Sequence, residues 1–269
     1  MSMRSVEIPV VKPMNPATRT ASREIRRAEK LAQKGQWIEA IQLLDQAMAL
    51  GADRYTCYLR QARLYQEGRQ LQEALSVAEK AIAEAPQRLS AREAIIALHL
   101  AARNYELAAS ASKALLKISP RHVPARDALG AAYIALGNIE GAMRVATELI
   151  RLDPSNASHR FNRAHLYQHL GEVQLAIEEF EMVVAISNDP ELISNSQEQI
   201  EALDALQIRQ IVALAFEDSL FRMELLRNPA YAIHSKCYYL SDNGLALLQD
   251  NVIEHLASLG LSSRPTLYH

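Results

Sequence analysis

Small and large apolar positions alternate with polar ones in a pattern that repeats every 34 residues. Alanine recurs at this interval in the middle of the chain, at Ala40, Ala74, Ala108, Ala142 and Ala176. Five windows without insertion therefore cover residues 21–190. Within each window, position 8 is mostly small and position 17 is mostly large and apolar. Gly at position 15 of three windows and Pro at position 32 of three are helix-ending signals. The pattern predicts one helix pair per window, with helix A before position 15 and helix B after it.

These columns resemble the tetratricopeptide repeat, most clearly in LGAAYIALGNIEGAMRVATELIRLDPSN, residues 129–156. The small residue at position 8 and the Ala at position 20 let helices A and B approach closely. One helix pair cannot bury its apolar face alone, so neighbouring pairs are expected to stack. The resemblance implies an all-α fold, a right-handed solenoid of five helix-turn-helix repeats.

Both ends depart from the repeat. Residues 1–20 contain three Pro and are expected to form a flexible N-terminal arm. The first repeat helix is polar, with Glu24 at an apolar position and basic residues at Arg23, Arg26, Arg27 and Lys30. A solvated capping face is the main interpretation, and a basic docking patch for an acidic partner is the alternative. After the repeats, the pattern predicts a capping helix at 191–205 and a small helical module at 206–269.

The C-terminal module is expected to contain helices at 207–217, 219–235 and 241–256, with Asp218 or Ser219 capping the second and Ser241 the third. Residues 206–249 resemble the nitrile-hydratase-leader-like segment of bacterial ribosomal peptide precursors. The matching residues are Asp218, Phe221, Arg222, Leu225, Leu226, Asn228, Pro229, Tyr238, Leu240 and Ser241. The segment departs from that family at Cys237, at Asn243-Gly244 and in lacking a Gly-Gly cleavage site. A compact helical cap on the repeats is the simpler interpretation.

Composition supports this organisation and narrows the function. The chain has 269 residues, of which 42 are Ala and 9 are Gly, and its net charge is −2. Abundant Ala favours closely packed helices. Balanced charge argues against nucleic-acid binding, which needs a clear excess of cations. The two widely separated cysteines fit a reducing, cytoplasmic location. No apolar run is long enough to span a membrane.

The candidate binding surface is the inner groove, which in tetratricopeptide proteins is lined by positions 2, 5, 6, 9, 12 and 13 of helix A. Applied to repeats 2–5, this correspondence predicts a shallow groove with an apolar centre and a polar rim, suited to a helical or extended protein segment. The cations and amides of a carboxylate clamp are missing apart from Arg60. The predicted contacts are Arg60, Arg63, Glu93, Ala97, Leu100, Asp127, Ala131, Ile134, Asn162, His165 and His169. Occupation of the groove by the chain's own termini is the alternative.

The sequence contains no recognisable catalytic or metal-binding pattern. His165 and His169 have an i, i+4 spacing that can ligate zinc, but no third ligand is evident. Phosphate-binding loops and nucleophile motifs are absent. We therefore expect no enzymatic activity, no cofactor and no metal.

The sequence thus predicts a cytoplasmic, bacterial, non-enzymatic scaffold or adaptor whose partner is a protein or peptide. Two alternatives stay open. One is a chaperone or recognition partner in a modified-peptide or secretion pathway, acting through the C-terminal module. The other is a regulatory or accessory subunit of an enzyme complex.

Overall fold

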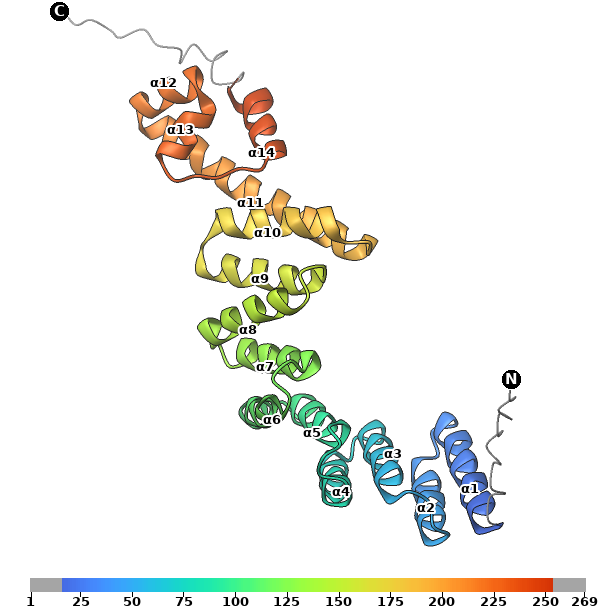
Figure 1. The fold of residues 1–269 in the computed structure, drawn as a ribbon. Helices are drawn as coiled ribbons and strands as arrows, with labels where there is room; N and C mark the ends of the chain where they lie inside the picture. Colours follow the sequence, from blue (N-terminus) through green and yellow to red (C-terminus); the bar gives the residue numbers. More distant parts are fainter. Residues whose placement is uncertain (1–15, 254–269) are drawn as a thin grey trace, which may run out of the picture. The chain divides into compact units, whose positions relative to one another are not determined.

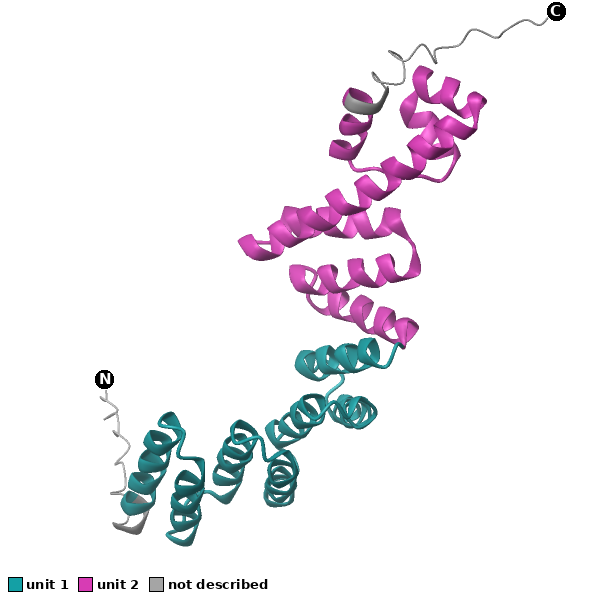
Figure 2. Ribbon diagram, turned by 180° about the vertical axis from the view of Figure 1, so that it is seen from behind, with its two compact units in different colours: residues 1–137 teal, residues 138–269 magenta. Residues whose placement is uncertain are grey.

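A computed structural model describes residues 16–253, and this part of the chain is built from helices (Figure 1). It divides into two compact units at Gly137, inside the fourth 34-residue window (Figure 2). Each unit is considered separately below. The predicted arm up to residue 15 and the expected third module helix beyond residue 253 lie outside the described residues.

Unit 1 consists of helices that alternate between the predicted A and B positions. Each B helix begins 34 residues after the last, in agreement with the sequence. The helices are α1 (Pro16–Gln33), α2 (Trp37–Ala49), α3 (Arg54–Glu67), α4 (Leu71–Glu84), α5 (Ser90–Ala101), α6 (Tyr105–Ile118) and α7 (Val123–Ala135). Consecutive helices pack together. In addition, α3 contacts α5, and α5 contacts α7. The A helices α3, α5 and α7 therefore lie side by side.

The alanine column explains the close packing of each helix pair. Ala40, Ala74, Ala108 and Ala176 are completely buried, and Ala142 is nearly so. Position 8 is buried in most windows as well, including Ile96, where a larger side chain is accommodated. The prediction that these columns hold the helices together is confirmed.

Position 15 adopts a left-handed backbone in all five windows. Gly35, Gly137 and Gly171 have φ values of 76°, 68° and 77°, as the C-cap prediction requires. The same column holds Arg69 and Arg103, whose φ values are 60° and 57°. The turn between helices A and B therefore imposes this conformation whatever residue stands there.

Unit 2 begins with three shorter helices and continues into one long helix. Its elements are α8 (Ile139–Leu152), α9 (Ala157–Leu170), α10 (Val173–Ile186), α11 (Pro190–Glu217), α12 (Ser219–Arg227), α13 (Pro229–Ser235), α14 (Asp242–Leu247) and a π-helical turn (Leu248–Ile253). Helix α11 packs against α10, and its C-terminal half supports α12 and α14.

The C-terminal helix boundaries correct the sequence prediction at two points. The expected cap and the first module helix are one helix, α11, because no Gly or Pro follows Pro190 until its end. The expected helix 219–235 is two helices, since Pro229 cannot continue α12 and instead starts α13. The side chain of Asn228 caps α13 by accepting a hydrogen bond from the Tyr231 N–H.

The predicted caps Asp218 and Ser241 are confirmed at the starts of α12 and α14. The C-terminal module has its own apolar core, whose buried members come from α11, α12, α13, Leu240 and the π-helical turn. Its fully buried members include Ile211, Ala215, Leu225 and Leu248.

Candidate functional site

The predicted inner positions of unit 1 lie on helices α3, α5 and α7. Because these helices contact one another in order, their equivalent positions form one face, which we call the inner face. Ala97, Ala131 and Ile134 are exposed there, and the Ile134 side chain keeps 46% of its surface accessible. Asp127 is also exposed, whereas Leu100 is half-buried against the core of α5, α6 and α7.

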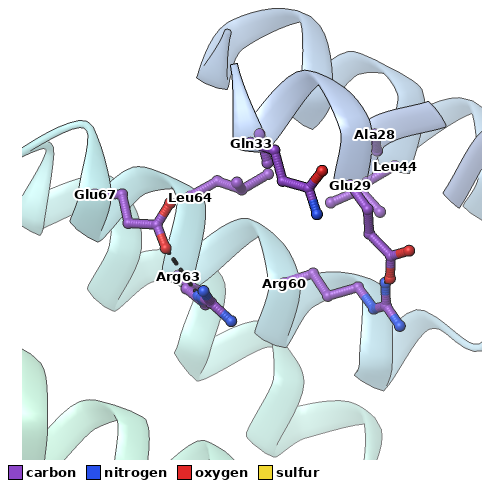
Figure 3. A pocket seen from close by; sticks show the side chains of 9 residues that line it. Ala28, Glu29, Gln33, Leu44, Arg60, Arg63, Leu64 and Glu67 are labelled. Atoms are coloured by element: carbon purple, nitrogen blue, oxygen red, sulfur yellow. Dashed lines mark hydrogen bonds and ion pairs between the residues drawn. The ribbon is translucent and has the colours of Figure 1, made fainter. Parts of the chain in front are cut away.

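A cavity of about 460 Å³ lies where α1 meets α3 (Figure 3). Its apolar lining comes from Ala28 and Ala32 on α1, Leu44 on α2 and Leu64 on α3. Its polar lining comes from Glu29, Gln33, Arg60, Arg63 and Glu67. Arg60 and Arg63 are two of the predicted contacts, so the structure brings them together at one cavity.

Ion pairs organise the polar rim of this cavity. A guanidinium nitrogen of Arg60 on α3 donates to the carboxylate of Glu29 on α1, which links the two helices across the opening. Arg63 Nε donates to Glu67 Oε1 at 2.8 Å, within α3. The Arg63 side chain is 80% exposed. An exposed i, i+4 pair of this kind contributes only about 0.3–0.5 kcal/mol, so Arg63 can exchange its partner at little cost.

Glu93 has a structural partner on the neighbouring A helix. Nδ1 of His122 accepts a hydrogen bond from the Ala125 N–H at 3.1 Å and so caps α7. The other ring nitrogen, Nε2, lies 2.8 Å from Glu93 Oε1 and donates to it when Nδ1 accepts. This contact joins α5 to the start of α7, and it partly occupies the carboxylate that was predicted to face a ligand.

The remaining predicted contacts belong to α9 in unit 2. Asn162 and His169 are exposed. His165 is half-buried and packs edge-on against Phe161 and Phe180, with ring centroids 4.6 and 5.2 Å away. Its Nδ1 lies 2.8 Å from Oε1 of Gln168. His165 is therefore part of the packing of α9 on α10.

The sequence prediction missed the contribution of the first repeat to the cavity. Glu29, Ala32 and Gln33 occupy positions 9, 12 and 13 of the first window, the same columns that were used in later repeats. That correspondence could have found them. Leu44 and Leu64 carry no such signal, because their part in the cavity depends on how α1, α2 and α3 pack.

Neither a metal centre nor a reactive thiol emerges at these positions. Within residues 16–253, no group of three or more His, Cys, Asp or Glu side chains could hold a metal ion. Burial raises the pKa of the Cys57 thiol, which keeps it protonated and unreactive. No described helix is long and apolar enough to cross a membrane.

The repeats match known family models. Residues 56–88 and residues 128–190 each match a model described as "Tetratricopeptide repeat". Together with the helix pairs of both units, these matches define the fold as that of a tetratricopeptide-repeat solenoid. No curated protein matches the sequence.

Solved structures agree with this fold at low sequence identity. MamA 41-end from Desulfovibrio magneticus RS-1 is 18% identical with a TM-score of 0.55, over 65% of this chain and 97% of that one. YrrB, described as a TPR protein with an unusual peptide-binding site, is 17% identical with a TM-score of 0.53, over 68% and 98%. A further MamA structure is 15% identical with a TM-score of 0.52, over 64% and 96%. The resemblance of residues 206–249 to a peptide-precursor leader stays a prediction.

Proposed function

We propose that this protein is a non-enzymatic interaction scaffold that binds a protein or peptide segment on the inner face of its tetratricopeptide repeats. The observation that carries the proposal is the exposure of apolar side chains on neighbouring A helices of unit 1. Ala97, Ala131 and Ile134 face solvent there, although the helices bearing them have buried their other faces.

The size of these side chains supports a bound backbone or helix. Alanine leaves room for close approach, while Ile134 offers apolar surface that is buried on binding. The cavity between α1 and α3 opens at the same A-helix columns, so it can receive a side chain of the bound segment. Specificity then depends on the rim residues Arg60, Arg63, Glu67 and Glu29.

An affinity capture with Ile134→Arg tests the proposal. The substituted side chain is exposed, so the fold is expected to tolerate the change, while a cation on the apolar face opposes docking. We expect the full-length variant to lose proteins that the wild-type chain retains, as identified by mass spectrometry.

A matched control is Leu107→Arg on α6. Leu107 is also in unit 1 and is 53% exposed, but it belongs to a B helix. The proposal requires this variant to keep the wild-type partners. Binding at the inner face would be contradicted if both variants lost the same partners, or if both variants kept them.

A further inference from the structure

Helix α1 carries a row of cations along one side. Arg19, Arg23, Arg26 and Lys30 follow one another at intervals of three or four residues, and Lys34 continues this spacing in the turn just after the helix ends at Gln33. At 100° per residue the four helical members fall within an arc of about 60°, and they extend over about 17 Å of helix length. All are exposed. We call these residues the α1 cationic row.

The α1 cationic row has no counter-charge within the described chain. The two carboxylates of α1 form ion pairs with other residues. Glu24 pairs with Arg27 at 2.7 Å, and Glu29 pairs with Arg60. None of the cations in the row makes an ion pair with a described residue. The row is therefore a local concentration of positive charge on a chain whose net charge is −2.

The row borders the cavity between α1 and α3. Glu29 and Gln33 line the cavity, and they follow Arg26 and Lys30 by three residues, the spacing of neighbours on a helix surface. Arg63, on the other side of the cavity, forms the weak ion pair with Glu67 and no other ion pair with a residue that the structure describes. Cations thus flank an opening that has an apolar floor.

We propose that the cavity and the α1 cationic row together bind an acidic, amphipathic protein segment. One apolar side chain of the partner fills the cavity above Leu44 and Leu64, and carboxylates beside it pair with Arg26, Lys30 and Arg63. This inference rests on the proposed function and names the chemistry of its partner.

The cavity favours a protein over a nucleic acid or a lipid surface. A phosphate backbone offers no apolar side chain and would leave the apolar floor of the cavity unfilled. The apolar side of α1 is buried against α2, so α1 has no free apolar face to insert into a membrane. Charge complementarity combined with an apolar pocket is the arrangement that an acidic segment with one large apolar side chain fits.

A random peptide library displayed on phage tests the inference with the full-length chain. We expect selection to enrich peptides rich in Asp and Glu around a Leu, Ile or Phe. Binding of an enriched peptide should weaken about tenfold in Arg26→Glu/Lys30→Glu, and it should weaken as salt rises.

The control variant is Lys80→Glu/Lys117→Glu, which changes net charge equally on exposed B-helix positions of unit 1. It should bind the enriched peptide like the wild type. Equal losses in both variants would show a nonspecific charge effect and overturn the inference. So would enrichment of peptides without acidic bias, or failure to enrich any peptide.

Two further measurements separate this inference from the proposed function. Peptides that lack acidic bias, bind the wild type and are lost in Ile134→Arg would sustain inner-face binding and overturn the acidic partner. Acidic peptides whose binding depends on Arg26 and Lys30 and is unchanged by Ile134→Arg would sustain the acidic partner and overturn binding at the inner face. Binding of single-stranded oligonucleotides or phosphatidylserine vesicles, dependent on the row and tighter than any selected peptide, would also overturn the inference.

Discussion

The left-handed arginines of unit 1 offer a direct test of the repeat architecture. Arg69 and Arg103 hold φ values near 60°, a conformation that costs an L-residue about 1–2 kcal/mol. Glycine adopts it freely but loses more backbone entropy on folding, about 0.5–1 kcal/mol. We therefore expect Arg69→Gly and Arg103→Gly each to raise the free energy of unfolding by about 0.5–1 kcal/mol.

The two gains should add, because the sites are one repeat apart and neither side chain forms an ion pair with a described residue. For a chain of this size about 1 kcal/mol corresponds to about 2–4 °C in Tm, so the double variant, with a gain of about 1–2 kcal/mol, should melt about 2–8 °C higher. The measurement is thermal and guanidinium unfolding followed by helical circular dichroism. Repeat proteins can unfold in stages, so the transition of the N-terminal repeats is the relevant one.

The double alanine variant Arg69→Ala/Arg103→Ala is the control. It removes the same charges but keeps a Cβ, so the backbone strain should remain. A gain equal to that of the glycine variant would mean that charge, not backbone conformation, is responsible. A glycine variant no more stable than the wild type would refute the strain argument.

Three further changes probe packing and charge in unit 2. Ala176→Leu should destabilise the fold by about 1–3 kcal/mol in denaturant titration, because this fully buried position has no room between α9 and α10; unchanged stability would contradict the packing role of the column. Gly244→Ala should loosen α14, because an added Cβ would clash with the buried Asp204 carboxyl group. The measurement is amide hydrogen exchange in α14, which should become faster, and an exchange rate equal to that of the wild type would contradict the prediction. Glu181→Gln should stabilise the fold at neutral pH. Partial desolvation, then the charges of nearby carboxylates, raises the pKa of the exposed residue Glu181 above its ordinary value of 4.5. The folded state therefore keeps a proton that the unfolded state has lost, and stability falls as pH rises through this window. The advantage of Gln should vanish below about pH 4.5, and an advantage that persists there would refute the assignment.

Local signals in the sequence were sufficient for the helix pairs but not for the C-terminal helix ends. The 34-residue period places every A and B helix, because the Ala and Gly columns report requirements that are the same in each repeat. At the C-terminus the period is lost. The continuity of α11 then depends on the absence of a helix breaker, and the end of α12 on Pro229.

The candidate site was predictable only in part. Arg60 and Arg63 were found because they occupy known columns of helix A. Their partners differ in origin: Glu67 is a neighbour on the same helix, whereas Glu29 lies 31 residues away and meets Arg60 only when α1 packs beside α3. The contact of Glu93 with His122 likewise joins residues of adjacent repeats.

The sequence alone determined that this protein is built from stacked helix pairs followed by a non-repeating helical end, because periodic side-chain size dictates which helix faces must touch. Tertiary structure decided where that stack leaves space. The cavity exists because Ala28 and Ala32 are too small to fill the gap that Leu44 and Leu64 leave between α1 and α3. Its volume and its ion-paired rim result from contacts between repeats, and no single window of the sequence contains them.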